Sequence, residues 1–367
     1  MRISIFYFIM KKSIIRFRLL FNREIAGQLI LMAIAATLVL SSCGRTEDAG
    51  KESFRHHVII DTDANNEVDD QHALAYLFFS GDDFAVEGVT VNATSDPRDG
   101  VTYSSVSDHY DEAKRVMQLC GVWNRIPLHT GAQGSFDEIE GNIHEGEFDG
   151  HEAVNFIIEQ ALKERDQELI LLPVGKLTNI ALALKKEPSI AENIRIVWLG
   201  ANYPEPGEHN LEWDIEAMNY ILDVDVPFEM VTVRYGDPSG TDAVKVSQAQ
   251  MLHRMPEKGS KISEPVTGRH GGEFHTWGDY SANLFEMYDM GGNPPSRPLF
   301  DQAAVAIVKN SDWAESYKHP APIYKDGQWV ERPDNSRKIT IWEWFDIYGI
   351  INDFFVVMNN PVTTERP

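Results

Sequence analysis

The chain has few cysteines and few basic residues, and both shortages exclude classes of protein. Only two cysteines, Cys43 and Cys120, occur in 367 residues. Two thiols cannot form a dense disulfide framework, and no cysteine–histidine cluster has the spacing of a zinc site. Lysine and arginine number 33 against 56 aspartates and glutamates, which gives a formal net charge of −23. Because nucleic-acid binding needs a basic surface, nucleic acid is not an expected partner.

Long apolar runs are also scarce. The run Leu29–Leu40 has only about twelve residues, too few to span a bilayer as a helix but suited to the core of a signal peptide. Basic residues precede it, and Leu40-Ser41-Ser42-Cys43 follows. This tetrapeptide resembles the lipobox of bacterial lipoproteins, in which Cys43 carries the lipid. The alternative is an ordinary signal peptide with a cysteine nearby.

These features predict three parts: a lipoprotein signal peptide over residues 1–42, a polar tether over 43–55 and a single domain over 56–367. The protein would then be an exported lipoprotein of the bacterial cell envelope, periplasmic or on the outer-membrane surface. Its contact with the membrane would be made by the lipid on Cys43. Cys120, in an apolar helical stretch, is expected to be buried.

Within the domain, short apolar runs alternate with segments of helical spacing. This alternation predicts an α/β fold with an open, mostly parallel central sheet and helices on both faces. The expected strands are 57–60, 86–91, 126–128, 169–174, 194–199 and 228–233, and the expected helices are 71–79, 110–119, 153–163, 179–185, 216–222, 303–308 and 345–358. Residues 235–298, rich in glycine and proline, are expected to form insertions around a site. Residues 323–343 are expected to form a hairpin that turns at Asp326-Gly327.

An acidic loop, residues 61–70, follows the first expected strand directly. It contains four aspartates and a glutamate in ten residues. Ligands gather beyond the carboxyl ends of strands in open α/β sheets, and so many carboxylates repel one another unless a cation lies among them. Oxygen ligands favour calcium or magnesium over zinc. The alternative is a solvated turn in which Asp69 or Asp70 caps the next helix.

The order Asp61-Thr62-Asp63 and then Asp69-Asp70 resembles the signature of the inosine-uridine nucleoside hydrolase family. Five residues separate the two acidic groups, two more than the family's usual three, and this resembles a divergent branch of exported bacterial proteins. Most of residues 57–310 follows the family in order. The segment 172–181 is similar to its Pro-x-Gly-x-Leu-Thr-Asn motif, 126–132 to a strand, and 208–210 with 214–217 to its Glu-Phe-Asn and Asp-Pro-Glu-Ala motifs.

The resemblance implies a calcium ion and a set of residues around it. The implied ligands are Asp63, Asp70, the main-chain carbonyl of Val174, and Asp301. Asp63 would also be the general base that deprotonates the attacking water, while Asp61 would support the loop from behind.

The same resemblance implies contacts with the substrate. Asp69 would hydrogen-bond the ribose, and Asn202, Glu208 and Asn210 would hold it, mainly on its 5′ side. The alternative for the last three is loop capping and turn chemistry. Asp214 is expected simply to begin the helix that follows it.

The chain departs from the family where a histidine that can protonate a purine leaving group is expected. The family has His-Asp there, and this chain has Phe300-Asp301. His270 and His275, on a glycine-containing loop, are the candidate replacements, and Trp277 is a candidate to stack on the base. The alternative for each histidine is a surface loop residue.

Together these features predict calcium-dependent hydrolysis of the N-glycosidic bond of ribonucleosides, giving ribose and free base, as in purine and pyrimidine salvage. The expected partner is therefore a small-molecule nucleoside or another ribosyl substrate. Two alternatives remain: a related glycoside hydrolase acting on another sugar, and a non-catalytic sugar-binding surface lipoprotein. The sequence leaves open whether the protein forms a homo-oligomer.

Overall fold

The computed structural model describes residues 55–66, 68–96 and 101–366. The expected signal peptide, Cys43, nearly all of the tether and Glu67 of the acidic loop lie outside the described residues. Within the described part, no helix combines the length and apolarity needed to cross a membrane.

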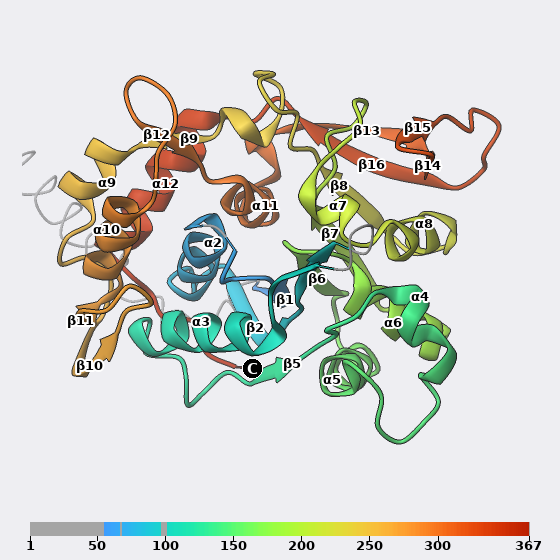
Figure 1. The fold of residues 1–367 in the computed structure, drawn as a ribbon, viewed down its shortest axis with the longest axis horizontal. Coiled ribbons are helices and arrows are strands. Elements are labelled where there is room, and N and C mark those ends of the chain that lie inside the picture. Colours follow the sequence, from blue (N-terminus) through green and yellow to red (C-terminus); the bar gives the residue numbers. More distant parts are fainter. Residues whose placement is uncertain (1–54, 67, 97–100, 367) are drawn as a thin grey trace, which may run out of the picture. The chain divides into compact units, whose positions relative to one another are not determined.

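An eight-stranded sheet forms the centre of the domain, in the order β13-β16-β8-β7-β6-β1-β2-β5 (Figure 1). All neighbouring strands are parallel except β13, which is antiparallel to β16 at one edge. The mostly parallel sheet expected from the sequence is therefore confirmed. The strands are β1 (His56–Thr62), β2 (Phe84–Val91), β5 (Leu128–Thr130), β6 (Leu169–Pro173), β7 (Ile194–Leu199), β8 (Phe228–Val231), β13 (Glu315–Pro320) and β16 (Lys338–Glu343).

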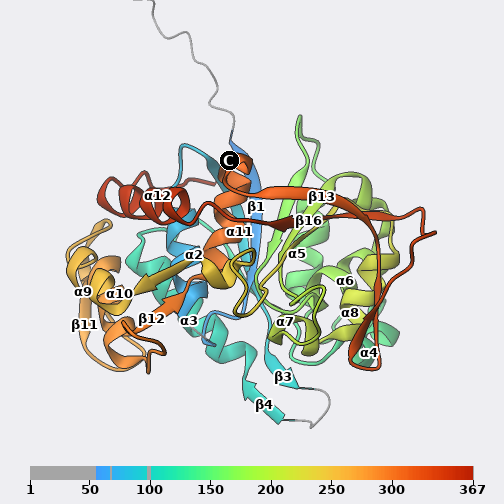
Figure 2. The same cartoon turned by 90° about the horizontal axis from the view of Figure 1, so that it is seen from above.

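Helices cover both faces of this sheet (Figures 1 and 2). Side chains alternate between faces along a strand, so Val58 and Ile60 of β1 join one hydrophobic cluster while Ile59 joins the other. Because both faces are covered, the central strands contain runs of buried apolar residues, such as 58–60 in β1 and 169–172 in β6. One face carries α2 (Val68–Phe78), α3 (Val106–Leu119), α10 (Trp277–Met287), α11 (Phe300–Lys309) and α12 (Ile347–Asn359), and the other α4 (Phe136–Ile139), α5 (His151–Ala161), α6 (Thr178–Lys186) and α8 (Ile215–Asp223).

The strand order reverses between β1 and β6. From β1 the chain builds the sheet outward through β2 and β5, and then returns to add β6, β7, β8 and β16 on the other side. In open α/β sheets such a reversal leaves a crevice at the carboxyl ends of the two central strands, where ligands bind. Those ends are Thr62 and Pro173, so the acidic loop begins at this crevice.

The remaining elements lie around the sheet. The expected insertions contain β9 (Lys245–Ser247) paired with β12 (Ser296–Pro298), α9 (Gln248–Arg254), and a hairpin of β10 (Lys261–Thr267) and β11 (Glu273–Thr276). A second hairpin pairs β3 (Thr94–Asp96) with β4 (Val101–Ser104), and α7 (His209–Glu212) follows β7.

Two expectations about the strands need correction. The strand expected at 126–128 begins at Leu128, because proline at 127 cannot donate a hydrogen bond within a strand. The hairpin expected over 323–343 is shorter: β14 (Ile323–Lys325) and β15 (Gln328–Val330) do turn at Asp326-Gly327, where both φ values are positive, 52° and 76°. Strand β16, however, leaves the hairpin and enters the central sheet between β8 and β13.

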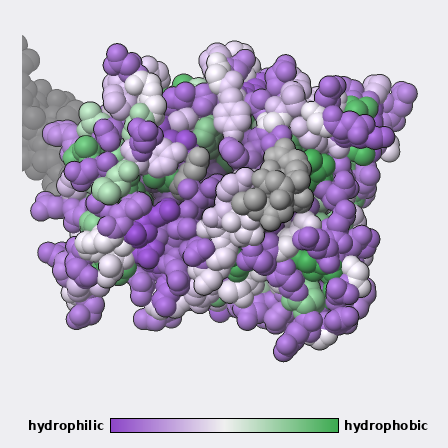
Figure 3. Space-filling view, viewed as in Figure 1, coloured by the Kyte–Doolittle hydropathy of each residue, from purple (hydrophilic) through white to green (hydrophobic). Residues whose placement is uncertain are grey.

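Hydrophilic residues cover most of the face that Figure 3 shows, and hydrophobic residues form small separate patches on it. This distribution fits a chain in which 24% of the residues are charged. Cys120, as expected, is fully buried at the end of α3. Burial raises the pKa of its thiol, so the thiol is unreactive.

Candidate active site

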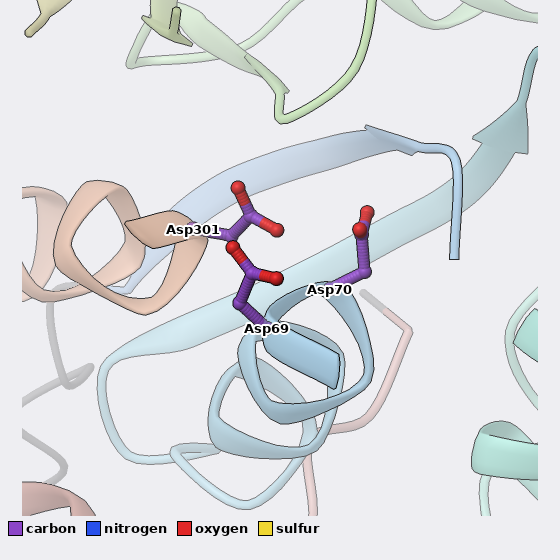
Figure 4. Close-up of side chains that lie close together, drawn as sticks. All are labelled: Asp69, Asp70 and Asp301. Carbon is purple, nitrogen blue, oxygen red and sulfur yellow. The ribbon is translucent and has the colours of Figure 1, made fainter. Parts of the chain in front are cut away.

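Carboxylates from two helices meet at the carboxyl end of the sheet. Asp69 and Asp70 lie in the first turn of α2, and Asp301 lies in the first turn of α11 (Figure 4). One carboxylate oxygen from each of the three lies within 4.8 Å of the others. Helix N-termini carry partial positive charge, which makes them suitable positions for acidic side chains. Residues that are more than 230 positions apart in the sequence, Asp69 and Asp301, therefore form one cluster.

A pocket of about 380 Å³ contains this cluster. All four metal ligands expected from the sequence line it, together with three of the expected ribose-binding residues. The lining consists of Asp63, Asn66, Asp69, Asp70, Val174, Leu199, Glu208, His209, Asn210, Val233, Tyr235, Phe300 and Asp301.

The carboxylates of the cluster are deeply buried. Asp63 and Asp301 are only 1% and 2% exposed. Burial, followed by repulsion between neighbouring carboxylates, raises the pKa of Asp63, Asp69 and Asp301 well above the ordinary range. Burial is also the main cause that raises the pKa of Asp70 to about 6. Their ionised forms are therefore disfavoured unless a cation neutralises them.

Within the described part of the chain, two carboxylate oxygens of the pocket lack hydrogen-bond donors, as expected for oxygens that bind a cation. Among the described residues, the buried Asp63 Oδ2 and Asp69 Oδ1 have no hydrogen-bond partner, although Asp69 Oδ1 lies 3.6 Å from the guanidinium Nη2 of Arg297. Buried carboxylate oxygens without donors are costly and are usually satisfied by an ion. A donor set made only of oxygens matches a hard divalent cation such as calcium.

Asp61 lies behind the cluster and supports it. The side chains of Thr90, Asn92 and Asn179 donate hydrogen bonds to its carboxylate, at 2.5, 2.5 and 2.7 Å. The residue is fully buried, and burial raises its pKa to about 6. The supporting position expected for Asp61 is confirmed.

Short contacts fix the carboxylates that line the pocket. Thr62 Oγ1 donates to Asp70 Oδ1 at 2.6 Å. Gly175, two residues after the end of β6, lies so close to Asp63 that a Cβ atom there would be 2.9 Å from Asp63 Oδ1. Glycine is therefore required for the close approach of this backbone to the acidic loop.

The longer acidic loop is held at Asn65 by three other segments. The Asn65 amide donates to His109 Nδ1 of α3 at 2.9 Å, and its side-chain Nδ2 donates to Ser104 Oγ at 2.9 Å. Arg269, on the turn of the β10–β11 hairpin, donates to the Asn65 carbonyl at 3.2 Å. The sequence alone gave no signal for these three contacts, because they join segments far apart in the chain.

The expected ribose-binding residues divide into two groups. Glu208 accepts from the amides of Asn210 and Leu211 and so caps α7, while Asn210 Nδ2 donates to the Val174 carbonyl at 2.8 Å. Both line the pocket, and the carbonyl of Val174 retains a second lone pair for a metal. Asn202 lies outside the lining: its side chain bonds to Pro206 and to the Tyr235 amide. Glu208 therefore both caps a helix and lines the pocket, whereas Asn202 only makes hydrogen bonds within the surrounding loops.

Asp214 begins α8, as expected. It is the N-cap residue and accepts from the Ala217 amide at 3.1 Å. Thr178 of the Leu-Thr-Asn motif also donates to it. Asp214 is therefore a structural residue that joins α6 to α8.

The expected base-binding residues are not at the pocket. Trp277 is completely buried in the hydrophobic core, with its ring centroid 5.2 Å from that of His72, so the stacking role expected for it is contradicted. His270 and His275 are exposed on the β10–β11 hairpin and do not line the pocket. His275 Nδ1 instead contacts the Ile262 carbonyl of the same hairpin at 3.2 Å.

A second, larger pocket of about 1180 Å³ adjoins the first. Three residues line both pockets: His209, Tyr235 and Phe300. His209 and Tyr235 were not among the site residues expected from the sequence. For His209 a signal was present, because it lies between Glu208 and Asn210, which were both expected at the site. The other residues of the larger pocket are Asp242, Lys245, Tyr288, Asp289, Gly291, Gly292, Asn293, Pro294, Ser296, Arg297 and Pro298.

Comparison with known proteins identifies the family. The model of the inosine-uridine preferring nucleoside hydrolases matches residues 58–342. A putative pyrimidine-specific ribonucleoside hydrolase from Shigella boydii is 32% identical over 166 residues, which cover 44% of this chain and 61% of that protein. The chain thus spans less than two thirds of this curated relative.

Solved structures share the fold. A plant nucleoside hydrolase superposes with a TM-score of 0.63 at 16% identity, covering 83% of this chain and 99% of the plant protein. A purine-preferring ribonucleoside hydrolase from Gardnerella vaginalis superposes with a TM-score of 0.59 at 19% identity, covering 83% and 98%. From the match over 58–342, the chain belongs to the inosine-uridine preferring nucleoside hydrolase family.

Proposed function

We propose that this protein is a calcium-dependent hydrolase that cleaves the N-glycosidic bond of ribonucleosides to give ribose and free base. The observation that carries the proposal is the convergence of Asp63, Asp69, Asp70 and Asp301 in one pocket, at the point where the strand order reverses. Membership of the family supports the same reaction.

Asp63, Asp70, Asp301 and the Val174 carbonyl would hold the ion. Bound there, calcium would neutralise the buried carboxylates and lower the pKa of a water in the site. Asp63 has a buried oxygen without a hydrogen-bond partner, and it is the residue that takes the proton of the attacking water.

The other pocket residues act on the sugar. Asp69, Glu208 and Asn210 line the pocket, each at the start of a helix. Backbone amides hold the Glu208 carboxylate, and Asn210 Nδ2 donates to the Val174 carbonyl. The oxygens of these three side chains bind ribose hydroxyls and fix the sugar relative to the water. Cleavage passes through an oxocarbenium-like state, and the negative charge of the cluster stabilises that developing positive charge.

One observation favours a second candidate function. Phe300 lines the pocket where the family's histidine would stand, and it has no proton to give to a leaving base. A ribosyl or other glycoside with a better leaving group would need no such proton. The second candidate is therefore hydrolysis of a related glycoside by the same carboxylates.

An assay of sugar release tests the proposal. The purified chain is incubated with inosine, uridine, adenosine and p-nitrophenyl riboside, each with calcium or with a chelator. The proposal expects ribose release from at least one nucleoside, which the chelator stops and Asp63→Ala abolishes. Release from p-nitrophenyl riboside alone would favour the second candidate, and no release from any substrate would leave a sugar-binding protein.

We also propose that the protein is exported and anchored by lipid on Cys43, with residues 1–42 removed. Support comes from the basic lead, the apolar run and Leu40-Ser41-Ser42-Cys43. Radiolabelled palmitate given to expressing bacteria should label the full chain but not a Cys43→Ser variant. Equal labelling of both, or labelling of neither, would contradict the anchor.

A further inference from the structure

Three side chains stand where the two pockets meet: His209, Tyr235 and Phe300. The smaller pocket holds the carboxylates, and the larger one, at about 1180 Å³, is the space next to them that can take a base. If ribose occupies the smaller pocket, the bond that breaks lies at this boundary. A residue at the boundary is therefore well placed to give the departing base a proton.

Compared with the two family motifs that these segments resemble, the positions of histidine and phenylalanine are exchanged in this chain. Where the family reads Glu-Phe-Asn and His-Asp, the chain reads Glu208-His209-Asn210 and Phe300-Asp301. The two positions lie on different helices, α7 and α11, yet both line both pockets. The exchange therefore keeps one imidazole at the boundary and moves it to the other helix.

His209 is positioned for this role. It is exposed at the start of α7, and its ring lies 5.4 Å from that of Trp213. The preceding residue, Glu208, is held by three backbone amides, so its carboxylate is fixed in place.

The other boundary residues are poorer donors. Phe300 has no acidic proton, and its ring packs edge-on against Tyr235 at 5.9 Å. Burial and nearby acids, Glu208 first, raise the pKa of Tyr235 above its ordinary value, which makes its phenol a weaker acid. An imidazole, in contrast, is the side chain that most often donates protons near neutral pH.

The cations of the larger pocket are also less suitable. Lys245 pairs with Asp242 at 2.9 Å. The guanidinium of Arg297 does not lose its proton in proteins, so it can bind a base but cannot protonate it.

We propose that His209 protonates the leaving base, a role that rests on the proposed function of the site. As the C1′–N bond breaks, its electron pair goes to the base nitrogen, and the imidazolium of His209 gives its proton to the base. The water oxygen bonds to C1′, and one water proton goes to Asp63. Transfer of that proton through solvent to His209 restores both residues, so that one water is consumed for each ribose and base released.

Substrates that differ in their leaving group test this assignment. The His209→Gln variant should lose about 10²- to 10⁴-fold in kcat/KM on the nucleosides that the wild type cleaves, the usual contribution of a general acid. On p-nitrophenyl riboside, whose leaving group needs no proton, it should stay within about threefold of the wild type. The matched control is His253→Gln, an exposed histidine of α9, which should leave both rates unchanged.

A second test exchanges the two residues, so that histidine stands at 300 and phenylalanine at 209, and it does not depend on a single variant. His209→Phe should be as impaired on nucleosides as His209→Gln, and adding Phe300→His should recover at least about tenfold of the loss, because it returns the imidazole to the family's position. No recovery, together with equal losses on nucleosides and on p-nitrophenyl riboside, would show that His209 only shapes the pocket.

The outcomes separate this inference from the proposed function. If the wild type releases nitrophenol but no base from any nucleoside, His209 is not an effective acid, while a glycosidase remains. If Asp63→Ala abolishes both activities but His209→Gln affects them equally, the hydrolase stands and the assignment of His209 is wrong. If the wild type releases nothing from any substrate, both fail.

Discussion

Asn179 Nδ2 donates a hydrogen bond to Asp61 Oδ2 at 2.7 Å, although 118 residues separate them. Its Oδ1 accepts from the Ala132 amide at 2.8 Å. Asn179 therefore joins the acidic loop, the segment after β5 and the start of α6, which are three of the segments that resemble the family. These three segments, which are far apart in the sequence, are thus hydrogen-bonded to one another behind the carboxylate cluster.

The first prediction concerns this contact. Asn179→Ala removes a donor from a fully buried carboxylate and should lower the free energy of unfolding by about 2–3 kcal/mol. Urea unfolding followed by circular dichroism measures this change. The matched control is Asn155→Ala, because the Asn155 side chain bonds to Lys186 at the surface, and its effect should be below about 0.5 kcal/mol. Equal effects of the two variants would contradict the supporting role.

The second prediction concerns Gly175. A Cβ at this position would meet Asp63 Oδ1 at 2.9 Å, so Gly175→Ala should displace the carboxylate that we propose as both metal ligand and base. Calcium affinity should fall at least about tenfold, in the range found when the supports of metal ligands are disturbed. Gly141→Ala, where nothing lies within 4 Å of the added Cβ, should leave calcium affinity unchanged. Unaltered affinity in Gly175→Ala would show that Asp63 is free to move.

The third prediction concerns the pH dependence of stability. The Asn65 amide donates to His109 Nδ1, which must therefore be unprotonated, and burial lowers the pKa of His109 from 6.5 to about 4. The unfolded chain thus takes up this proton at a higher pH than the folded chain does. The contribution of His109 to the free energy of unfolding is complete above pH 6.5 and is lost as the pH falls toward 4, by about 1.4 kcal/mol for each pH unit.

Comparison with His109→Gln isolates this effect, since glutamine can accept from the same amide but does not titrate. In urea unfolding between pH 6.5 and 4.5, the wild type should lose more stability than the variant, and the difference should grow as the pH falls. Parallel curves for the two proteins would mean that His109 is not held neutral in the fold.

The sequence predicted the fold and the position of the acidic loop because both depend on local patterns. Apolar runs of strand length alternate with helical spacing, and the acidic loop directly follows β1, so its place at the carboxyl edge of the sheet is determined by chain order alone. The convergence of Asp301 with Asp63 also followed from the resemblance, and the structure shows both in one pocket.

Other features could not be read from the sequence, for physical reasons. Trp277 looked like a base-stacking residue on a glycine-containing loop, but it begins α10, whose apolar face packs into the core. His270 and His275 were plausible acids by type, yet the hairpin that carries them does not bring them to the pocket. The three contacts that hold Asn65 depend on how distant segments pack, which no local pattern encodes.

The most direct test of the account is a calcium titration of the purified chain by isothermal titration calorimetry, carried out with the wild type and with Asp301→Asn. The account predicts one calcium ion per wild-type chain and an affinity at least about 100-fold weaker in the variant, because one of the converging carboxylates is lost. Absence of calcium binding to the wild type, or equal affinity in Asp301→Asn, would contradict the claim that these carboxylates share one ion.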